Sequence, residues 1–203
     1  MNRWVRGQLG GGISGLFGIR MIDKQALRQH LKQQRRSLSA TDIATASLCA
    51  CDLLRRDARF QAANTIAIYS PFAGEIDPSG LISSQQSFYL PVVDNGEGMR
   101  FVETNRAEAM HPNRFGILEP QGDESLEAAS LDMVVLPLVA FNRRGVRLGM
   151  GAGFYDRALA NAGSTPCRVG FAYDWQEVDE LMNDPWDVPL HAVVTDKEII
   201  HCS

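Results

Sequence analysis

One short stretch of the chain concentrates the residue types that bind anions. The segment RLGMGAGFYDR, residues 147–157, places three glycines at alternate positions between two arginines and adds one aspartate, Asp156. It follows an almost continuously apolar run, residues 133–141, and precedes a helical pattern that begins at Phe154. A strand, a glycine-rich loop and a helix in this order can direct unpaired backbone N–H groups at a phosphate. A phosphate site and a purely structural turn both remain open here, because glycines also punctuate ordinary turns.

The loop matches neither of two common nucleotide-binding motifs. The chain contains no GxxxxGKS or GxxxxGKT sequence, which is the pattern of the P-loop. In the dinucleotide fingerprint GxGxxG, the third glycine after Gly149 and Gly151 would fall at Phe154. Neighbouring charges must therefore decide the role of the loop.

Basic residues occur where they could complete an anion site. Lys24, Arg28 and Lys32 are spaced by four residues, so they share one face of a predicted helix. Arg143 and Arg144 lie just before the glycine loop. The alternative for the helix is a solvated basic face, which needs no ligand.

Two acidic residues are candidates for chemistry. Asp156 lies beside the glycine loop, where a carboxylate could hold a magnesium ion, although an acid is also favourable in the first turn of a helix. Glu75 follows the apolar run at 65–69, near the carboxyl end of a predicted strand, where open α/β sheets bind ligands. The alternative for Glu75 is an acid placed near a helix N-terminus.

The hydrophobic pattern predicts an α/β protein. Good helix formers with an apolar stripe predict a helix over 22–38, and Ser39 or Thr41 caps a second helix that continues to residue 60. Because the runs at 65–69 and 133–141 are almost wholly apolar, we expect central strands covered on both faces, in a three-layer α/β/α sandwich with a mostly parallel or mixed sheet. The predicted strands are 65–72, 87–93, 99–104, 133–141, 168–173 and 191–195.

Three further segments have weaker patterns. The sequence EIDPSGLISSQQ, residues 75–86, predicts a helix capped by Asp77 with Pro78 in its first turn. Residues 175–182 predict a short helix, and residues 103–129 predict irregular surface structure.

Composition narrows the class of protein. A chain of 203 residues, 45% of them hydrophobic, can bury one substantial core, so we expect a single domain over 21–203. The net charge of −4 argues against a nucleic-acid partner, and no apolar run approaches the roughly 18 residues of a membrane span. The four cysteines lack the spacing of a zinc site or a disulfide framework, which favours a reducing, cytoplasmic location. No obligate protein partner is evident.

The first twenty residues differ from the rest of the chain. Residues 1–20 carry arginines and many glycines but no acid, and they match neither a secretory signal nor a transit peptide. We expect a disordered extension, or a functional chain that starts at Met21.

Four segments together resemble one known family. They are KQALR at 24–28, YSPFAGEID at 69–77, PLVAFNRRGVRLGMGAGFYDR at 137–157 and WDVPLHAVVT at 186–195. In this order they resemble the 5-formyltetrahydrofolate cyclo-ligases, also called methenyltetrahydrofolate synthetases. The resemblance implies an enzyme that uses Mg-ATP to close 5-formyltetrahydrofolate into 5,10-methenyltetrahydrofolate, with release of ADP and phosphate. It further implies that the formyl oxygen attacks the γ-phosphate before N10 closes the ring.

The resemblance also implies roles for particular residues. Asp156 would bind magnesium. Substrate contacts would come from Ser70, Glu75, Met150 and Phe154. ATP contacts would come from Lys24, Arg28, Arg147, Leu148, Gly149, Met150, Gly151, Ala152, Gly153, Phe154 and Tyr155.

Two positions depart from what many relatives carry. Ala152 stands where many have lysine or arginine, and His191 stands where many have aspartate. Neutral imidazole is a poor magnesium ligand, so we expect His191 to be a partly buried structural residue at a strand start.

Two other functions are compatible with the same residues. A sugar-phosphate isomerase on a related scaffold would hold its substrate phosphate in the glycine loop, use Glu75 as a base and need no ATP. A non-catalytic relative would bind folate or nucleotide without turnover, as the changes at Ala152 and His191 would allow.

Overall fold

The computed structural model describes residues 22–202 apart from 95–97, 105–108 and 123, so the expectations for residues 1–20 lie outside the described residues. Within that part, the α-helices are α1 (Lys24–Arg36), α2 (Ala40–Arg55), α3 (Ala58–Ala62) and α4 (Phe154–Leu159). Three short 3-10 turns span Pro78–Leu81, Ala128–Ser130 and Asp174–Gln176.

Eight strands form one sheet, and two short hairpins lie beside it. The sheet order is β12-β11-β10-β7-β1-β2-β3-β6; β11, β10, β7, β1 and β2 are mutually parallel, and β12, β3 and β6 pair antiparallel. The predicted mixed, mostly parallel sheet with N-terminal helices is confirmed. The strands are β1 (Thr65–Ala67), β2 (Ser87–Val93), β3 (Met99–Glu103), β4 (Met110–Pro112), β5 (Leu118–Pro120), β6 (Ser125–Leu126), β7 (Met133–Pro137), β8 (Ala140–Phe141), β9 (Arg147–Leu148), β10 (Cys167–Phe171), β11 (Ala192–Val194) and β12 (Ile199–His201).

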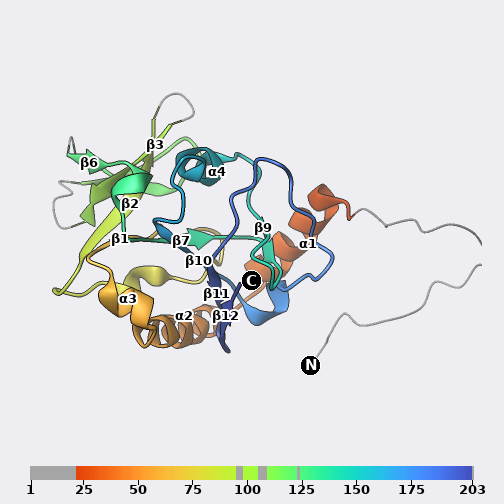
Figure 1. Ribbon diagram of the computed structural model, residues 1–203. Coiled ribbons are helices and arrows are strands. Elements are labelled where there is room, and N and C mark those ends of the chain that lie inside the picture. Colours follow the sequence, from red (N-terminus) through yellow and green to blue (C-terminus); the bar gives the residue numbers. More distant parts are fainter. Residues whose placement is uncertain (1–21, 95–97, 105–108, 123, 203) are drawn as a thin grey trace, which may run out of the picture.

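Alternation along β7 explains the layers. Met133 and Val135 pack with residues of α2 and α3 on one face of the sheet. Val134 and Leu136 pack with Leu159 of α4 on the other face. Figure 1 shows the same arrangement, with α2 and α3 below the sheet and α4 above it. A strand buried on both faces loses the polar side of the usual alternation, so its sequence is continuously apolar.

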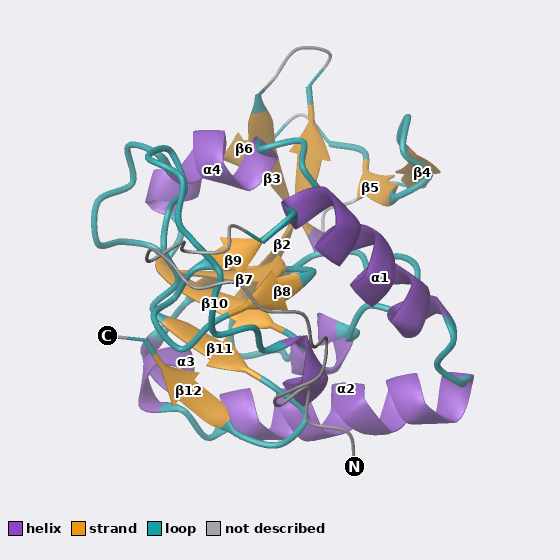
Figure 2. Cartoon of the chain, turned by 90° about the vertical axis from the view of Figure 1, so that its right-hand side faces the viewer, coloured by secondary structure: helices purple, strands orange, loops and turns teal. Residues whose placement is uncertain are grey.

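The helix α1 lies apart from this sandwich, against the β8–β9 hairpin (Figure 2). Its buried Leu31 packs with Val139, Ala140 and Leu148. The N-cap is Asp23, whose side chain accepts hydrogen bonds from two backbone N–H groups of the first turn. The helix therefore presents its first turns to the loop that follows β9.

The second predicted helix is broken in two. Ser39, one of the two candidate caps, accepts a hydrogen bond from the N–H of Asp42 and begins α2. Helix α2 ends at Arg55, and Asp57 then caps α3 by accepting from the N–H of Arg59. A second capping residue inside the periodic run is what ends the first helix.

Two predicted helices are wrong. Residues 75–86 form only the 3-10 turn after Asp77, although Asp77 caps it as expected by accepting from Ser79. Residues 175–182 form no helix beyond the end of a 3-10 turn, because the buried Gln176 side chain donates to the carbonyls of Leu138 and Val139. Tertiary hydrogen bonds here override the local helical pattern.

The predicted strand at 133–141 is two elements. Strand β7 ends at Pro137, and β8 pairs with β9 in a separate antiparallel hairpin. Side chains of Gln176 and Arg35 take the Leu138 carbonyl, so the strand cannot continue its ladder there.

The segment expected to be irregular contains order that matters. Residues 103–129 include β4, β5 and β6, and β4 pairs with β5 in a hairpin. Short strands with exposed positions carry too little periodicity to be recognised. This hairpin supplies part of the site described next.

Candidate active site

The predicted site residues converge on one cavity of about 410 Å³. It lies at the carboxyl ends of β1, β2 and β7, where open α/β sheets bind ligands. Every residue that the resemblance assigned lines this cavity: Lys24, Arg28, Ser70, Glu75, all of the loop Arg147–Tyr155, and Asp156.

The loop after β9 has a backbone that glycine makes possible. Gly151 and Gly153 have positive φ values of +104° and +70°, which other residues rarely adopt. Within the described part of the chain, no backbone N–H from Gly149 to Gly153 donates a hydrogen bond. These donors at the cavity wall are what an anion binds.

Helix α1 brings two cations to the loop. Arg28 Nε donates to the carbonyl of Gly149 at 2.9 Å, which ties the helix to the loop. Lys24 Nζ lies 2.6 Å from Asp184 Oδ2, a partly exposed ion pair at the cavity wall. The third residue of the predicted basic face, Lys32, does not line the cavity, and neither do Arg143 and Arg144.

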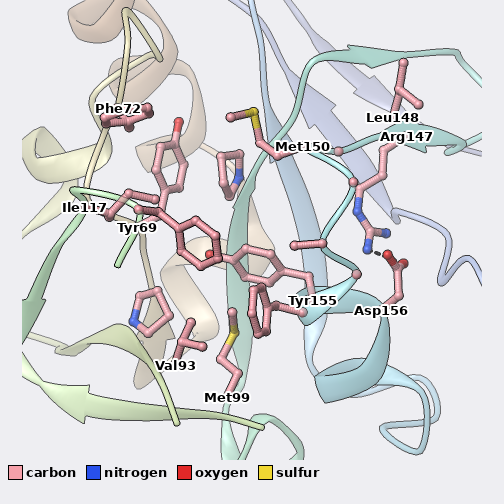
Figure 3. A pocket seen from close by; sticks show the side chains of 18 of the residues that line it. Tyr69, Phe72, Val93, Met99, Ile117, Arg147, Leu148, Met150, Tyr155 and Asp156 are labelled. Carbon is pink, nitrogen blue, oxygen red and sulfur yellow. Dashed lines mark hydrogen bonds and ion pairs between the residues drawn. The ribbon is translucent and has the colours of Figure 1, made fainter. Parts of the chain in front are cut away.

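Arg147 and Asp156 form an ion pair inside the site. Arg147 Nη2 lies 2.5 Å from Asp156 Oδ1, and the Arg147 side chain is 5% exposed. The same Oδ1 accepts from the N–H of Val188 at 3.2 Å, and Arg147 Nη1 donates to the Val188 carbonyl. Figure 3 shows the Arg147 and Asp156 side chains meeting, and their shared contacts with Val188 connect α4 to that later segment.

Glu75 is a buried carboxylate at the opposite side of the cavity. It is 7% exposed, its Oε2 accepts from the N–H of Phe72 at 3.0 Å, and Oε1 lies 3.2 Å from Arg35 Nη2. Burial raises the pKa of Glu75 above its ordinary value, against the lowering effect of Arg35. Ser70, at the cavity edge, donates to the Leu118 carbonyl of the β4–β5 hairpin.

An apolar half of the cavity was not found from the sequence. Figure 3 shows Tyr69, Phe72, Val93 and Ile117 facing Arg147 and Asp156 across Tyr155. Apolar residues at strand ends have the same sequence pattern whether they face a core or a cavity, so no local signal distinguished them. Other lining residues that the sequence did not reveal are Met99, Phe115, Leu118, Asp184 and Trp186.

His191 lies outside the cavity. Its Nδ1 accepts from the backbone N–H of Arg168 at 2.9 Å, and Nε2 lies 2.9 Å from the Arg168 guanidinium. Burial lowers the pKa of His191 below its ordinary value. These contacts are those of a partly buried structural side chain.

Three further observations concern the class of protein and its chemistry. Among the described residues, no group of three or more His, Cys, Asp or Glu side chains could hold a metal ion by itself. Helices in the described ranges are too short or too polar to cross a membrane. The four cysteines are free thiols.

A mixed α/β sheet with a glycine loop and an apolar cavity at its strand ends is an arrangement typical of enzymes that bind small ligands. Comparison with known proteins names the family. The profile of the 5-formyltetrahydrofolate cyclo-ligase family matches residues 20–196. The chain belongs to this family, and its activity is that of the family, an ATP-dependent cyclo-ligation.

Comparisons with individual relatives support the same family assignment. The chain is 38% identical over 146 residues to the 5-formyltetrahydrofolate cyclo-ligase of Escherichia coli K12, covering 68% of this chain and 80% of that one. It is 34% identical over 180 residues to the Haemophilus influenzae enzyme, covering 84% and 96%. The structure of Aquifex aeolicus 5,10-methenyltetrahydrofolate synthetase superposes with a TM-score of 0.79 at 30% identity, covering 89% and 93%. These matches support the ligase over the isomerase alternative.

Proposed function

We propose that the chain converts 5-formyltetrahydrofolate and ATP into 5,10-methenyltetrahydrofolate, ADP and phosphate by phosphorylating the formyl oxygen. The observation that carries this proposal is the pairing of two unlike halves in one cavity. One half is the loop Gly149–Gly153, whose backbone donors have no partner among the described residues, and the other is apolar around Glu75. The first suits phosphates, and the second suits a flat pterin.

The nucleotide occupies the loop half. Backbone donors of the loop hold the phosphate oxygens, and Lys24, Arg28 and Arg147 supply positive charge around them. Lys24 exchanges its contact with Asp184 for a phosphate, because a partly exposed ion pair is weak. Leu148, Met150, Ala152, Phe154 and Tyr155 complete this wall.

The folate occupies the apolar half. The adjacent 2-amino and N3–H donors of a pterin match the two oxygens of a carboxylate, which assigns them to Glu75. Ser70 lies at the edge of this half, while Met150 and Phe154 separate it from the nucleotide. This placement brings the formyl group toward the γ-phosphate.

The reaction follows from this placement. The formyl oxygen attacks the γ-phosphorus, the bond to the bridging oxygen breaks, and ADP leaves. N10 then attacks the formyl carbon, the carbon–oxygen bond breaks, phosphate leaves and the N10 proton is lost. Negative charge develops on phosphoryl oxygens throughout, so the loop N–H groups, Arg28 and Arg147 act by position and charge.

The residues present fit a magnesium ion that arrives with the nucleotide. Magnesium is commonly held by one or two carboxylates together with waters and phosphates. Asp156 Oδ1 contacts Arg147 and Val188, whereas Oδ2 makes no hydrogen bond with the described residues. Asp156 would therefore hold the ion, which would neutralise charge on the phosphates when bound.

The fate of one oxygen atom tests the proposal. Enzyme is mixed with Mg-ATP and 5-formyltetrahydrofolate carrying oxygen-18 in the formyl group, beside an ATP-free control. The absorbance of methenyltetrahydrofolate should rise only with ATP, and the released phosphate should carry one oxygen-18. Unlabelled phosphate would contradict phosphorylation of the formyl oxygen.

The cellular location of the enzyme and its lack of a nucleic-acid partner stay predictions. A cytoplasmic location is supported by the free thiols, and the net charge of −4 speaks against a nucleic-acid partner. Co-fractionation with membranes would contradict the first prediction, and co-fractionation with nucleic acid would contradict the second.

A further inference from the structure

Arg35 is an arginine whose burial the reaction does not explain. It lies in the last turn of α1, is 2% exposed and does not line the cavity. A buried guanidinium is costly unless its donors are used. Two of its nitrogens donate to carbonyls: Nε to Ala73 at 3.1 Å and Nη1 to Leu138 at 3.3 Å.

The remaining nitrogen of Arg35 faces Glu75. Nη2 lies 3.2 Å from Glu75 Oε1, which is close enough for an ion pair. The angles do not form a hydrogen bond, so within the described residues Nη2 is the buried side-chain polar atom without a hydrogen-bond partner. The attraction between the two groups is therefore electrostatic, and Glu75 keeps lone pairs for a ligand.

Arg35 also holds the turn that carries Glu75. Ala73 has a φ of +50°, which is rare for a residue with a side chain, and Gly74 follows with +79°. A Cβ at Gly74 would lie 2.7 Å from the Arg35 carbonyl, so this helix end and the turn are in close contact. The Gly74 carbonyl accepts from the Tyr173 hydroxyl at 2.9 Å. The turn is thus held in an unfavourable backbone conformation by contacts that include the Arg35–Ala73 hydrogen bond.

We propose that Arg35 is a positioning residue for folate: it orients the Glu75 carboxylate toward the pterin and holds the Ala73–Gly74 turn that carries it. This inference rests on the proposed placement of folate at Glu75. Because Arg28 lies on the same helix and contacts the glycine loop, α1 connects the two halves of the site through Arg28 and Arg35.

The charged and titratable groups around Glu75 make the pH dependence of folate affinity a test of the proposal. Arg35 and Lys32 on α1 face it as cations. The hydroxyls of Tyr69, Tyr155 and Tyr173 also face it, and burial raises the pKa of each, to about 12 for Tyr173, so all three stay neutral near neutral pH. Glu75 is then the group in this cluster whose charge changes as the pH falls.

The sign of the effect follows. Folate affinity is full above the pKa of Glu75 and is lost as the pH falls through it. Burial raises the pKa of Glu75 and Arg35 lowers it. Removing Arg35 therefore moves the loss of affinity to higher pH, whereas a variant that only weakens the fold lowers affinity by the same factor at every pH.

A double-mutant cycle tests the proposal with 5-formyltetrahydrofolate alone, by calorimetric titration without ATP. Arg35→Leu should weaken affinity by about tenfold or more, since it disturbs the hydrogen bonds that the pterin donates to the charged Glu75 carboxylate. In a Glu75→Gln background, the same change should alter affinity by less than about twofold, because Arg35 acts through Glu75. Arg36→Leu, which removes an exposed arginine from the same turn, is the matched control and should leave affinity unchanged.

The outcomes distinguish a failure of the proposed folate placement at Glu75 from a failure of the proposed role of Arg35. If Glu75→Gln leaves affinity unchanged, the placement of folate at Glu75 is wrong. If Glu75→Gln weakens binding but the loss from Arg35→Leu is independent of Glu75 and of pH, Arg35 is only structural. If Arg35→Leu does not fold, Arg35→Lys replaces it in the double-mutant cycle. Lysine keeps the positive charge but cannot bind the Ala73 and Leu138 carbonyls at the same time.

Discussion

The two loops that meet at the cavity are built on opposite principles. The loop Gly149–Gly153 and the turn at Ala73–Gly74 both use left-handed backbone, and both lie beyond the carboxyl end of a strand. In the first, the backbone donors have no partner within the described chain. In the second, side chains from α1 and from the segment after β10 hold the backbone carbonyls.

This difference matches the ligand that we propose for each loop. Phosphates present many equivalent oxygens, so a loop that offers several N–H groups can hold them without a fixed side chain. A pterin needs one carboxylate in one orientation, so the support of Glu75 must be built into the fold. The glycine loop is therefore expected to govern nucleotide binding with little effect on stability. The turn at 73–74 is expected to govern both folate binding and stability.

The largest expected effect comes from Asp156, the carboxylate that we propose to hold magnesium beside the phosphates. Asp156→Asn keeps an oxygen that can accept from Arg147 and Val188 but removes the negative charge. We expect kcat to fall by about 10²- to 10³-fold, by analogy with the loss of one transition-state contact. The concentration of Mg²⁺ needed for half-maximal rate should also rise. Unchanged turnover and unchanged magnesium dependence would contradict the assignment of Asp156.

A pair of glycine variants tests the comparison of the two loops directly. Gly74→Ala forces a Cβ against the Arg35 carbonyl at positive φ, so we expect a loss of about 1–3 kcal/mol in the free energy of unfolding. Gly149→Ala meets nothing within 4 Å, so stability should change by less than about 0.5 kcal/mol while the KM for ATP rises. Urea denaturation and steady-state kinetics measure both. Equal stability losses would remove the distinction between the loops.

A substitution at Arg28 should affect the KM values of the two substrates differently. It contacts the glycine loop through the Gly149 carbonyl and lines the cavity on the side that we propose for the nucleotide. Arg28→Ala should raise the KM for ATP by about tenfold, the effect of one charged hydrogen bond, and leave the KM for 5-formyltetrahydrofolate nearly unchanged. The reverse split would exchange the proposed places of the two substrates.

How much the sequence could predict depends on how local the signal is. Most strand positions, the caps Ser39 and Asp77 and the glycine loop follow from short-range patterns, and the structure agrees with them. The helix predicted at 175–182 fails because buried Gln176 makes hydrogen bonds to residues nearly forty positions away. Such contacts leave no periodic trace in the sequence.

The site shows the same limit. Its assigned residues came from three of the four motif segments, and all of them line one cavity. Tyr69 and Val93 were missed because an apolar residue at a strand end looks like core, and Arg35 because one more arginine on a basic helix looks solvated. Only the packed structure shows that Arg35 is buried against the Glu75 turn.

The smallest expected effect tests whether the glycine loop accepts more charge. Ala152 is exposed and lines the cavity within the glycine loop. Ala152→Lys adds a cation beside the proposed phosphates without displacing a buried group, so the KM for ATP should fall severalfold, consistent with a partly exposed charge pair. The gain should shrink at high ionic strength, because salt screens exposed charges. Ala152→Gln, of similar length but neutral, is the control, and an equal gain from it would show that side-chain length rather than charge matters here.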